Sequence, residues 1–269
     1  MSKVNENREG YKQTKLGWIP KDWEEVNFNN IPDKSIKWSL TGGPFGSDLK
    51  SEHYLEEGVR IIQLQNIGDG SFQNKYKIFT SNDKADELKG CNIFPGDLIL
   101  SKMGDPVTRT CVIPNHHERY LMGSDGIRLV PNEEEFDKDF VLTFINYSLF
   151  RNKAISHSTG STRQRIGLSD LKKLPFLKPQ LKEQKKIAKI LTTWDKAIEK
   201  QEQLIAKKEA LKKGLMQQLL TGKKRFPGFT DKWKEVKLGE CLNEKPKYGI
   251  NAAAVEFSSK LPKYLRITT

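Results

Sequence analysis

Short apolar segments alternate with turn-forming residues through the first two thirds of the chain. Val59–Ile67 is rich in β-branched residues and ends at the glycines Gly68 and Gly70. Leu98–Leu100 follows a Pro-Gly-Asp turn, and Gly126–Val130 is closed by a proline. Runs of this length, bounded by Gly, Pro and Asp, are typical of β-strands.

The apolar period changes over residues 139–156. Side chains there recur at the spacing of one helix face, which predicts an α-helix after the strands. The face consists of Phe140, Phe144, Tyr147 and Ile155. We therefore expect residues 1–178 to form one α+β domain with a mostly β core.

Residues 180–221 contain no proline and a single glycine, and their apolar positions follow a heptad-like spacing. Pro179 precedes this run and Gly222 follows it, as is common at helix ends. A helix of this length extends roughly 60 Å, which is more than a small core can cover. We expect a long coiled-coil-like spacer helix over 179–222, whose apolar seam pairs with a second helix. The expected helix-pairing residues are Ile187, Leu191, Trp194, Ile198, Ile205, Leu211 and Leu215.

The last segment, 223–269, resembles the start of the first. Trp23-Glu24-Glu25-Val26 recurs as Trp233-Lys234-Glu235-Val236, and Tyr264–Ile267 resembles the strand that begins near Arg60. Because a sheet cannot close on its first strands alone, we interpret this segment as the incomplete start of a second domain that is poorly packed by itself.

The formal net charge is +12, and its distribution matters more than its size. Residues 1–181 carry 25 Lys and Arg against 24 Asp and Glu, whereas residues 182–225 carry 13 against 5. The excess therefore lies mainly on the predicted helix. It favours an anionic partner such as nucleic acid, because bound lysines and arginines release counterions. A solvated, lysine-rich helix face explains it equally well.

The compartment is constrained by the cysteines and by the absence of long apolar runs. Cys91, Cys111 and Cys241 are widely spaced and form no Cys-x-x-Cys pair, which argues against a disulfide framework and against a structural zinc site. No run approaches the roughly 18 apolar residues of a membrane span, and the start of the chain has no secretory signal. We expect a cytoplasmic protein without a membrane partner.

Three separate segments, in the same order, resemble the specificity subunits of type I restriction-modification systems. Leu16–Trp23 resembles the opening of their target recognition domains, and Gly160–Ile166 resembles the close of such a domain. The runs Lys182–Asp195 and Lys213–Gly222, followed by Arg225–Phe229, resemble the first long spacer helix. The resemblance covers nearly the whole chain.

The resemblance implies a reader of double-stranded DNA that has no catalytic site. Members of this family have two target recognition domains, each reading half of a split sequence, held apart by two antiparallel helices. They assemble with methyltransferase subunits, which use S-adenosylmethionine to methylate adenine, and with a restriction and translocation subunit. S-adenosylmethionine, ATP and Mg are thus expected on the partner subunits, and no cofactor on this chain.

This sequence departs from the family pattern because it has one complete recognition domain, one spacer helix and only the beginning of a second domain. Two explanations remain open: a functional half-subunit that forms a homodimer through the helix, or the remnant of a truncated gene. A two-fold pair would rebuild the layout of two domains and two helices, and its target would be a split palindrome. A different class of function is a coiled-coil protein that binds the methyltransferase without productive DNA recognition.

The candidate DNA-binding residues lie in three polar loops. A loop closing the domain supplies arginine forks and an amide that can reach base edges or phosphates. A turn near Gly104 carries two cations, and a glycine-rich loop over 41–47 can approach DNA closely. Each loop is also explained as a solvated connector. The candidates are Ser47, Lys102, Arg109, Ser161, Thr162, Arg163, Gln164 and Arg165.

Motifs for catalysis are missing from the sequence. It contains neither the Asp/Asn-Pro-Pro-Tyr/Phe motif of adenine methyltransferases nor a phosphate-binding Walker motif. Asp97 and Lys102 have the spacing of a nuclease motif, but Leu100 stands where the second metal-binding carboxylate belongs. His116 and His117 are adjacent and are expected to point to opposite faces of a strand, so we predict no metal site and no enzymatic activity.

Overall fold

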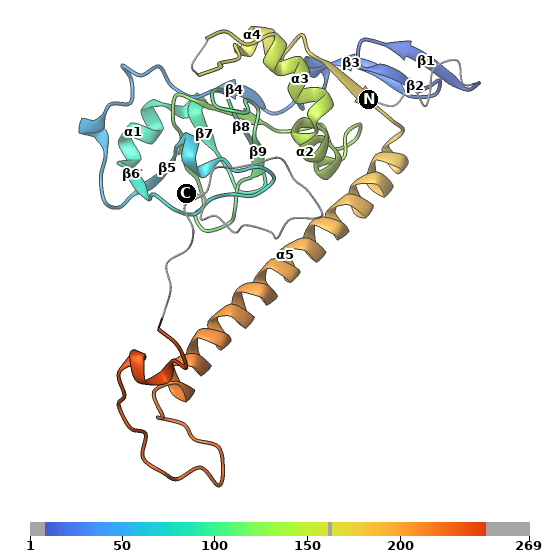
Figure 1. Cartoon of the computed structure of the whole chain (residues 1–269). Helices are drawn as coiled ribbons and strands as arrows, with labels where there is room; N and C mark the ends of the chain where they lie inside the picture. Colours follow the sequence, from blue (N-terminus) through green and yellow to red (C-terminus); the bar gives the residue numbers. More distant parts are fainter. Residues whose placement is uncertain (1–8, 161–162, 246–269) are drawn as a thin grey trace, which may run out of the picture. The chain divides into compact units, whose positions relative to one another are not determined.

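The structure is a computed structural model that describes residues 9–160 and 163–245 (Figure 1). The chain divides into two compact units, residues 1–202 and 203–269, with the boundary inside the long helix α5, Leu181–Leu219. No helix in the described ranges is long and apolar enough to cross a membrane.

Short strands and helices make up the first unit. The strands are β1 (Tyr11–Thr14), β2 (Gly17–Pro20), β3 (Glu24–Asn27), β4 (Leu40–Gly42), β5 (Val59–Ile62), β6 (Ile78–Thr80), β7 (Asn92–Ile93), β8 (Leu98–Ser101), β9 (Thr110–Val112), β10 (Tyr120–Met122), β11 (Gly126–Leu129) and β12 (Pro175–Lys178). The α-helices before α5 are α1 (Asn82–Glu87), α2 (Lys138–Asn146), α3 (Ser148–Ser156) and α4 (Leu168–Leu171). Five 3-10 turns are described, η1 (Phe28–Asn30), η2 (Ser51–His53), η3 (Leu64–Asn66), η4 (Lys89–Cys91) and η5 (Leu238–Cys241).

Two four-stranded sheets form the centre of this unit. The first sheet has the order β6-β5-β10-β7 and contains one parallel pair, β5 with β10. The second sheet has the order β4-β11-β8-β9 and is antiparallel throughout. Alternate side chains of each strand face opposite sides, so that Ile99 of β8 and Met122 of β10 meet in the core between the sheets. The strands predicted at 98–100 and 126–130 are confirmed.

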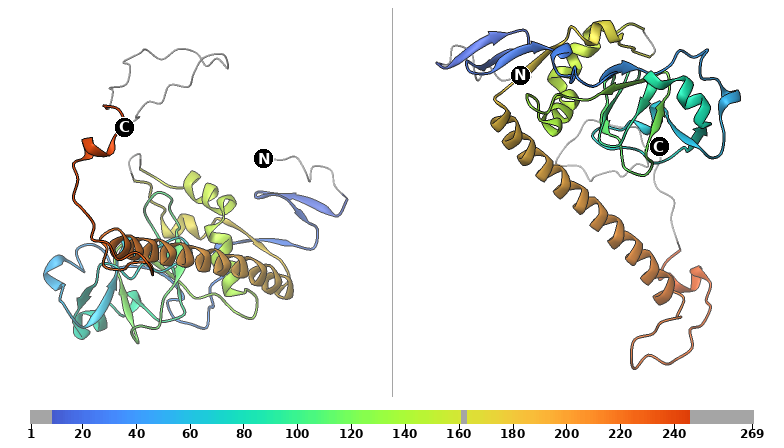
Figure 2. Two further views of the ribbon diagram at one scale, coloured as in Figure 1. Left: turned by 60° about the horizontal axis from the view of Figure 1, so that its bottom comes forward. Right: turned by 180° about the vertical axis from the view of Figure 1, so that it is seen from behind.

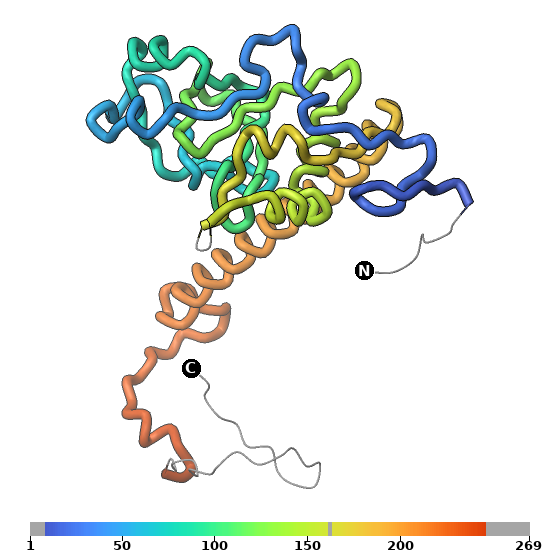
Figure 3. Tube along the Cα trace, turned by 90° about the horizontal axis from the view of Figure 1, so that it is seen from above, coloured from blue at the N-terminus to red at the C-terminus, as the bar shows by residue number. Residues whose placement is uncertain are grey.

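Helices cover the two outer faces of the paired sheets. Ala85 of α1 packs with Ile61 and Leu121 on the outer face of the first sheet. On the outer face of the second sheet, α2, α3 and the β3–β12 pair enclose a larger core rich in phenylalanine. In that core, the rings of Phe144 and Phe176 lie 4.7 Å apart. The hairpin of β1 and β2 lies at the margin of the domain (Figure 3).

Strand β12 leads directly into α5 (Figure 2), and the first turns of this helix are anchored to the domain. Gln184 is fully buried, and its amide bonds to three backbone groups. Ala188 is buried in the phenylalanine-rich core, and the indole of Trp23 donates a hydrogen bond of 3.0 Å to Glu183. The long helix predicted over 180–221 is confirmed.

The seam of α5 is exposed beyond its anchor. Ile187 packs partly against the domain, whereas Trp194 and Ile198 are 67% and 55% exposed. In the second unit, Leu211 and Leu215 border a shallow apolar groove together with Met216. The seam residues Leu191 and Ile205 are exposed as well.

Two predicted elements are wrong in extent. The strand expected over 59–67 ends at Ile62 and continues as η3, because the Asn66 side chain turns inward to bond to the backbone oxygens of Gln73 and Lys75. The helix expected over 139–156 is two helices, α2 and α3. Tyr147 between them has an extended backbone and an exposed ring, so it does not continue the apolar face.

The repeated segment differs between its two copies. Glu24–Asn27 forms β3 because β12 pairs with it, whereas Trp233–Val236 forms no strand. The 3-10 turn that follows begins at matched positions, Phe28 in the first copy and Leu238 in the second. The remainder of the predicted second copy, including Tyr264–Ile267, lies outside the described residues.

Candidate nucleic-acid interface

Three loops leave the same end of the second sheet. The register pairs Gly42 with Ile127, Gly126 with Ser101, and Leu100 with Thr110. The segments 43–48, 102–109 and 123–125 therefore emerge together at one edge of the sheet, which we call the loop end.

A fourth segment, residues 163–166, joins the loop end from a distant part of the sequence. Arg165 forms an isolated β-bridge with Met103 and another with Thr159. The amide of Gly104 donates to the carbonyl of Gln164 at 3.1 Å, and the amide of Ile166 donates to the carbonyl of Lys102 at 3.0 Å. The loop predicted from its arginines is thus held beside the turn predicted from Lys102 and Arg109.

The loop over 43–48 is pressed against the β10–β11 turn. The Gly43 amide donates to the Gly126 carbonyl at 2.8 Å. A Cβ atom at Gly43 would lie 1.8 Å from the carbonyl oxygen of Gly123, so no larger residue fits there without moving backbone. Gly43 is thus required by close packing, which fixes where the glycine-rich loop leaves the domain.

The turn between β8 and β9 is closed by Ser101. Its backbone amide donates to the carbonyl of Arg109 at 2.8 Å, and its hydroxyl accepts from the Arg109 amide at 3.0 Å. Thr108 has a positive φ of 60°, and the bond between Asp105 and Pro106 is cis. This network holds the backbone of both cationic residues of the turn in place.

Cations at the loop end differ in how they are paired. Arg165 forms an ion pair with Asp125 on the β10–β11 turn. Within residues 9–160 and 163–245, Lys102, Arg109 and Arg163 form no ion pair. The Arg109 guanidinium lies below Gly104, and its Nε is buried without a hydrogen-bond partner there. Three cations at the loop end therefore have no carboxylate partner in the described ranges, and Arg163 is the exposed one among them.

The other predicted residues are distributed as follows. Ser47 is exposed and its hydroxyl donates to Asp48 at 3.1 Å. Gln164 is half-buried, and its backbone holds the turn through Gly104. Ser161 and Thr162 lie outside the described residues.

The loop end also contains residues that are not among the candidates named from the sequence. Gln63 and Gln65 follow directly on β5, which ends at Ile62, and the Gly123 amide donates a hydrogen bond to the Ile62 carbonyl at 2.8 Å. Gln63 and Gln65 therefore lie just beyond the end of β5, on the side of the loop end. Phe45 also lies there, and its signal in the sequence is its position between Pro44 and Gly46 in a predicted connector.

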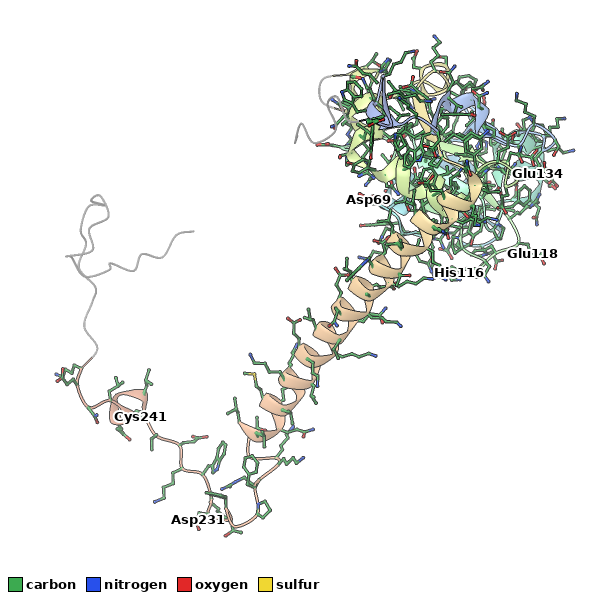
Figure 4. The ribbon with its side chains drawn as sticks, turned by 90° about the vertical axis from the view of Figure 1, so that its right-hand side faces the viewer. Asp69, His116, Glu118, Glu134, Asp231 and Cys241 are labelled. Atoms are coloured by element: carbon green, nitrogen blue, oxygen red, sulfur yellow. The ribbon has the colours of Figure 1, made fainter. Side chains whose placement is uncertain are left out.

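Residues considered for catalysis have structural partners. The Asp97 carboxylate accepts from the Arg128 guanidinium at 2.7 Å in a nearly buried pair. His117 packs edge-on against Tyr120, in the loop where Figure 4 labels His116 and Glu118. Burial lowers the pKa of His117, and the positive charge of Arg60 lowers it further. Burial also raises the pKa of Cys111 to about 12. Among the described residues, no group of three or more His, Cys, Asp or Glu side chains is placed to hold a metal.

The arrangement of strands, loop end and helix can be compared with known proteins. A family model described as the type I restriction modification DNA specificity domain matches residues 20–208. The chain belongs to this family. The matched range of this specificity domain contains all four segments of the loop end and the first part of α5.

Similar proteins from Methanocaldococcus jannaschii include the MjaVIII specificity subunit of a type I restriction enzyme, which is 24% identical over 219 residues. That alignment covers 80% of this chain and 49% of the relative. The putative MjaX specificity subunit is 25% identical over 255 residues, covering 88% and 56%. The specificity-domain chain thus spans about half the length of these curated relatives.

A solved structure of a type I restriction-modification system, concerned with complex assembly and conformational transition, has a similar chain. The TM-score is 0.54 at 21% identity, and the match covers 74% of this chain and 45% of that chain. This likeness supports the mixed α/β fold with its long helix.

Proposed function

We propose that this specificity-domain chain reads one half of a split DNA sequence with its loop end. The observation that carries the proposal is the convergence of four segments at one sheet edge, where three cations have no ion-pair partner in the described parts of the chain. DNA presents phosphates that attract such cations and base edges that a protruding loop can reach.

The side chains suit different parts of this task. Arg109 and Arg163 carry planar forks that match guanine, and Gln63 carries an amide that matches adenine. Lys102 provides a point charge suited to a phosphate. Arg165 keeps the domain-closing loop in place through Asp125. In this division of roles, the backbone network fixes the loops and the side chains of Arg109, Arg163 and Gln63 do the reading.

The chain itself is proposed to catalyse no step. Methyltransferase subunits, with S-adenosylmethionine, modify adenine at the sequence it selects. A restriction and translocation subunit, with ATP and Mg, acts on unmodified DNA. Disruption of the Asp97–Arg128 pair would be needed before Asp97 became a metal ligand, which supports a non-catalytic role.

Two copies of the chain pair through the seam of α5 in this proposal. The exposed Trp194 and Ile198 favour a helix partner, because burying apolar area stabilises association by about 25 cal/mol per Å². An isologous pair places two identical readers in opposite directions. The expected target is therefore a split palindrome.

DNA recognition is tested by selecting duplexes from a random pool with the purified full chain. We expect one enriched sequence, and we expect Arg109→Gln and Lys102→Ala to weaken binding to it by about tenfold each. Lys34→Ala is the matched control, because Lys34 lies near Asp33, whose amide bonds to Val130 beyond the other end of β11. Selection without an enriched sequence, while the chain still binds methyltransferase, supports an interaction protein and refutes the reader.

Pairing is tested by sedimentation of the full chain. Trp194→Glu places a charge on the exposed seam and should give a monomer. Lys196→Gln changes the net charge equally, but lies nearly opposite on the helix, since successive residues are about 100° apart. It should remain a dimer. Sequencing of the methylated sites in cells that also express the methyltransferase should then give a split palindrome, and two unlike half-sites would refute the symmetric pair.

A further inference from the structure

Phe45 is the most exposed large apolar residue in the described parts of the chain, at 83% exposed. It lies at the loop end, between Pro44 and Gly46, in a segment that leaves β4. An isolated exposed apolar side chain needs no explanation on a protein surface. The backbone that holds the Phe45 ring in solvent, however, is fixed on both sides, and that does require an explanation.

The segment that carries Phe45 is fixed on both sides. The Gly43 amide donates a hydrogen bond to the Gly126 carbonyl, and Gly43 packs closely on the backbone of Gly123. After Phe45, the Asp48 amide donates to the Phe45 carbonyl at 2.9 Å, and Leu49 is buried with the core on the outer face of the first sheet. The backbone is therefore tethered immediately before and after a ring that remains in solvent.

The surroundings of Phe45 distinguish a nucleic-acid contact from a protein contact. The neighbouring β10–β11 turn holds Asp125, whose carbonyl accepts from Lys102 and whose carboxylate pairs with Arg165. The exposed apolar residues Trp38 and Phe94 precede β4 and β8, and so lie toward the opposite end of the second sheet. A single exposed ring among polar residues, on a loop that leaves the sheet at the same end as the turn carrying Lys102 and Arg109, fits a DNA groove better than an apolar protein surface.

We propose that Phe45 is a base-contacting residue that contributes to sequence preference at one position of the half-site. Its ring packs on an apolar surface of a base, which is either the methyl group of thymine or the face of a base at an opened step. This inference rests on the proposed reading of DNA by the loop end. It adds an apolar reader to the cations and amides, and it explains why a ring is held in solvent by a fixed loop.

The first measurement compares affinities for the duplex recovered by selection and for an unrelated duplex. Phe45→Ala should lose about 10- to 100-fold in affinity for the selected duplex, as expected for loss of one base-to-aromatic contact, and less than about twofold for the unrelated one. Ile36→Ala is the matched control, since Ile36 is also exposed but precedes β4. Urea unfolding of the three proteins should coincide, because the Phe45 ring is outside the core.

A second measurement identifies the base surface. If the ring contacts a thymine methyl, replacing that thymine by uracil weakens binding of the wild type and leaves Phe45→Ala unchanged. If the ring enters an opened step, 2-aminopurine placed there brightens with the wild type and not with the variant. Equal affinity of Phe45→Ala and wild type for the selected duplex overturns the inference while leaving DNA recognition intact. An equal loss on both duplexes also overturns it, and absence of any preference in the wild type overturns both proposals.

Discussion

Replacing Gln184 with leucine removes the amide that fixes the first turns of α5 to the rest of the first unit. The Gln184 side chain is fully buried, and its oxygen accepts from the Asp137 amide at 2.9 Å. Its nitrogen donates to the carbonyls of Pro179 at 2.8 Å and Glu135 at 3.0 Å. Leucine has a similar volume, so the change tests the hydrogen bonds and creates little cavity.

The expected cost follows from the three backbone groups that lose a partner. Each unsatisfied buried group costs about 1–3 kcal/mol, and the buried leucine recovers part of that through its apolar surface. We expect a net loss of about 2–4 kcal/mol in the free energy of unfolding. For a unit of this size, that lowers Tm by roughly 5–15 °C. Urea denaturation followed by tryptophan fluorescence measures the loss directly.

Gln201→Leu is the matched control, because Gln201 is exposed on the same helix. It should change the free energy of unfolding by less than about 0.5 kcal/mol. If Gln184→Leu also stays within that margin, the buried amide is not what holds α5 to the domain, and the reasoning from its three hydrogen bonds is refuted.

Three further predictions concern ionisable groups that are buried or partly buried. Asp97→Ala leaves Arg128 buried without its anion and should lower the free energy of unfolding, measured by urea denaturation, by about 3–5 kcal/mol. Asp97→Asn should lower it by less. Burial raises the pKa of Cys111 to about 12, so the thiol ionises first in the unfolded state. Stability should therefore fall by about 1 kcal/mol per pH unit above pH 9, less so in Cys111→Ala. The pKa of His117 is lowered in the folded protein, so the unfolded chain takes up the proton first and stability is lost as pH falls below about 6.5. His117→Gln should therefore flatten the acid denaturation curve, and an unchanged curve would contradict this role of His117.

The sequence predicted those elements whose pattern is local. The period of α5 over 181–219 and the short strands β8 and β11 are written in consecutive residues, because each buries a face defined by its own side chains. Asn66 and Asn146 show why other boundaries were misplaced. Asn66 bonds to the backbone of 73–75, and Asn146 exchanges hydrogen bonds with Thr110. These long-range bonds end a strand and a helix that apolar periodicity alone would continue.

The candidate interface was predictable in its parts and not in its assembly. Lys102 and Arg165 could be selected as cations in polar loops, since loops at sheet edges commonly carry function. Their proximity depends on the bridge between Met103 and Arg165, which joins segments about 60 residues apart. The ion pair with Asp125 depends on the same bridge. No spacing in the sequence encodes such a contact, so Arg165 could not be distinguished from the unpaired Arg163.

The same core that holds α5 also holds the loops, and this fixes the loop end relative to the first turns of the helix. Val107, in the turn between β8 and β9, and Ile166, next to Arg165, are both fully buried in the core that receives Ala188 of α5. A close-packed interior transmits displacement instead of absorbing it. The direction of the loop end is therefore fixed relative to the first turns of the helix. In a pair joined through α5, the separation of the two half-sites would follow from the helix seam, whereas the bases read within each half-site would follow from the loops. Substitutions in the seam should change the spacing of the palindrome, and substitutions at the loop end should change its sequence.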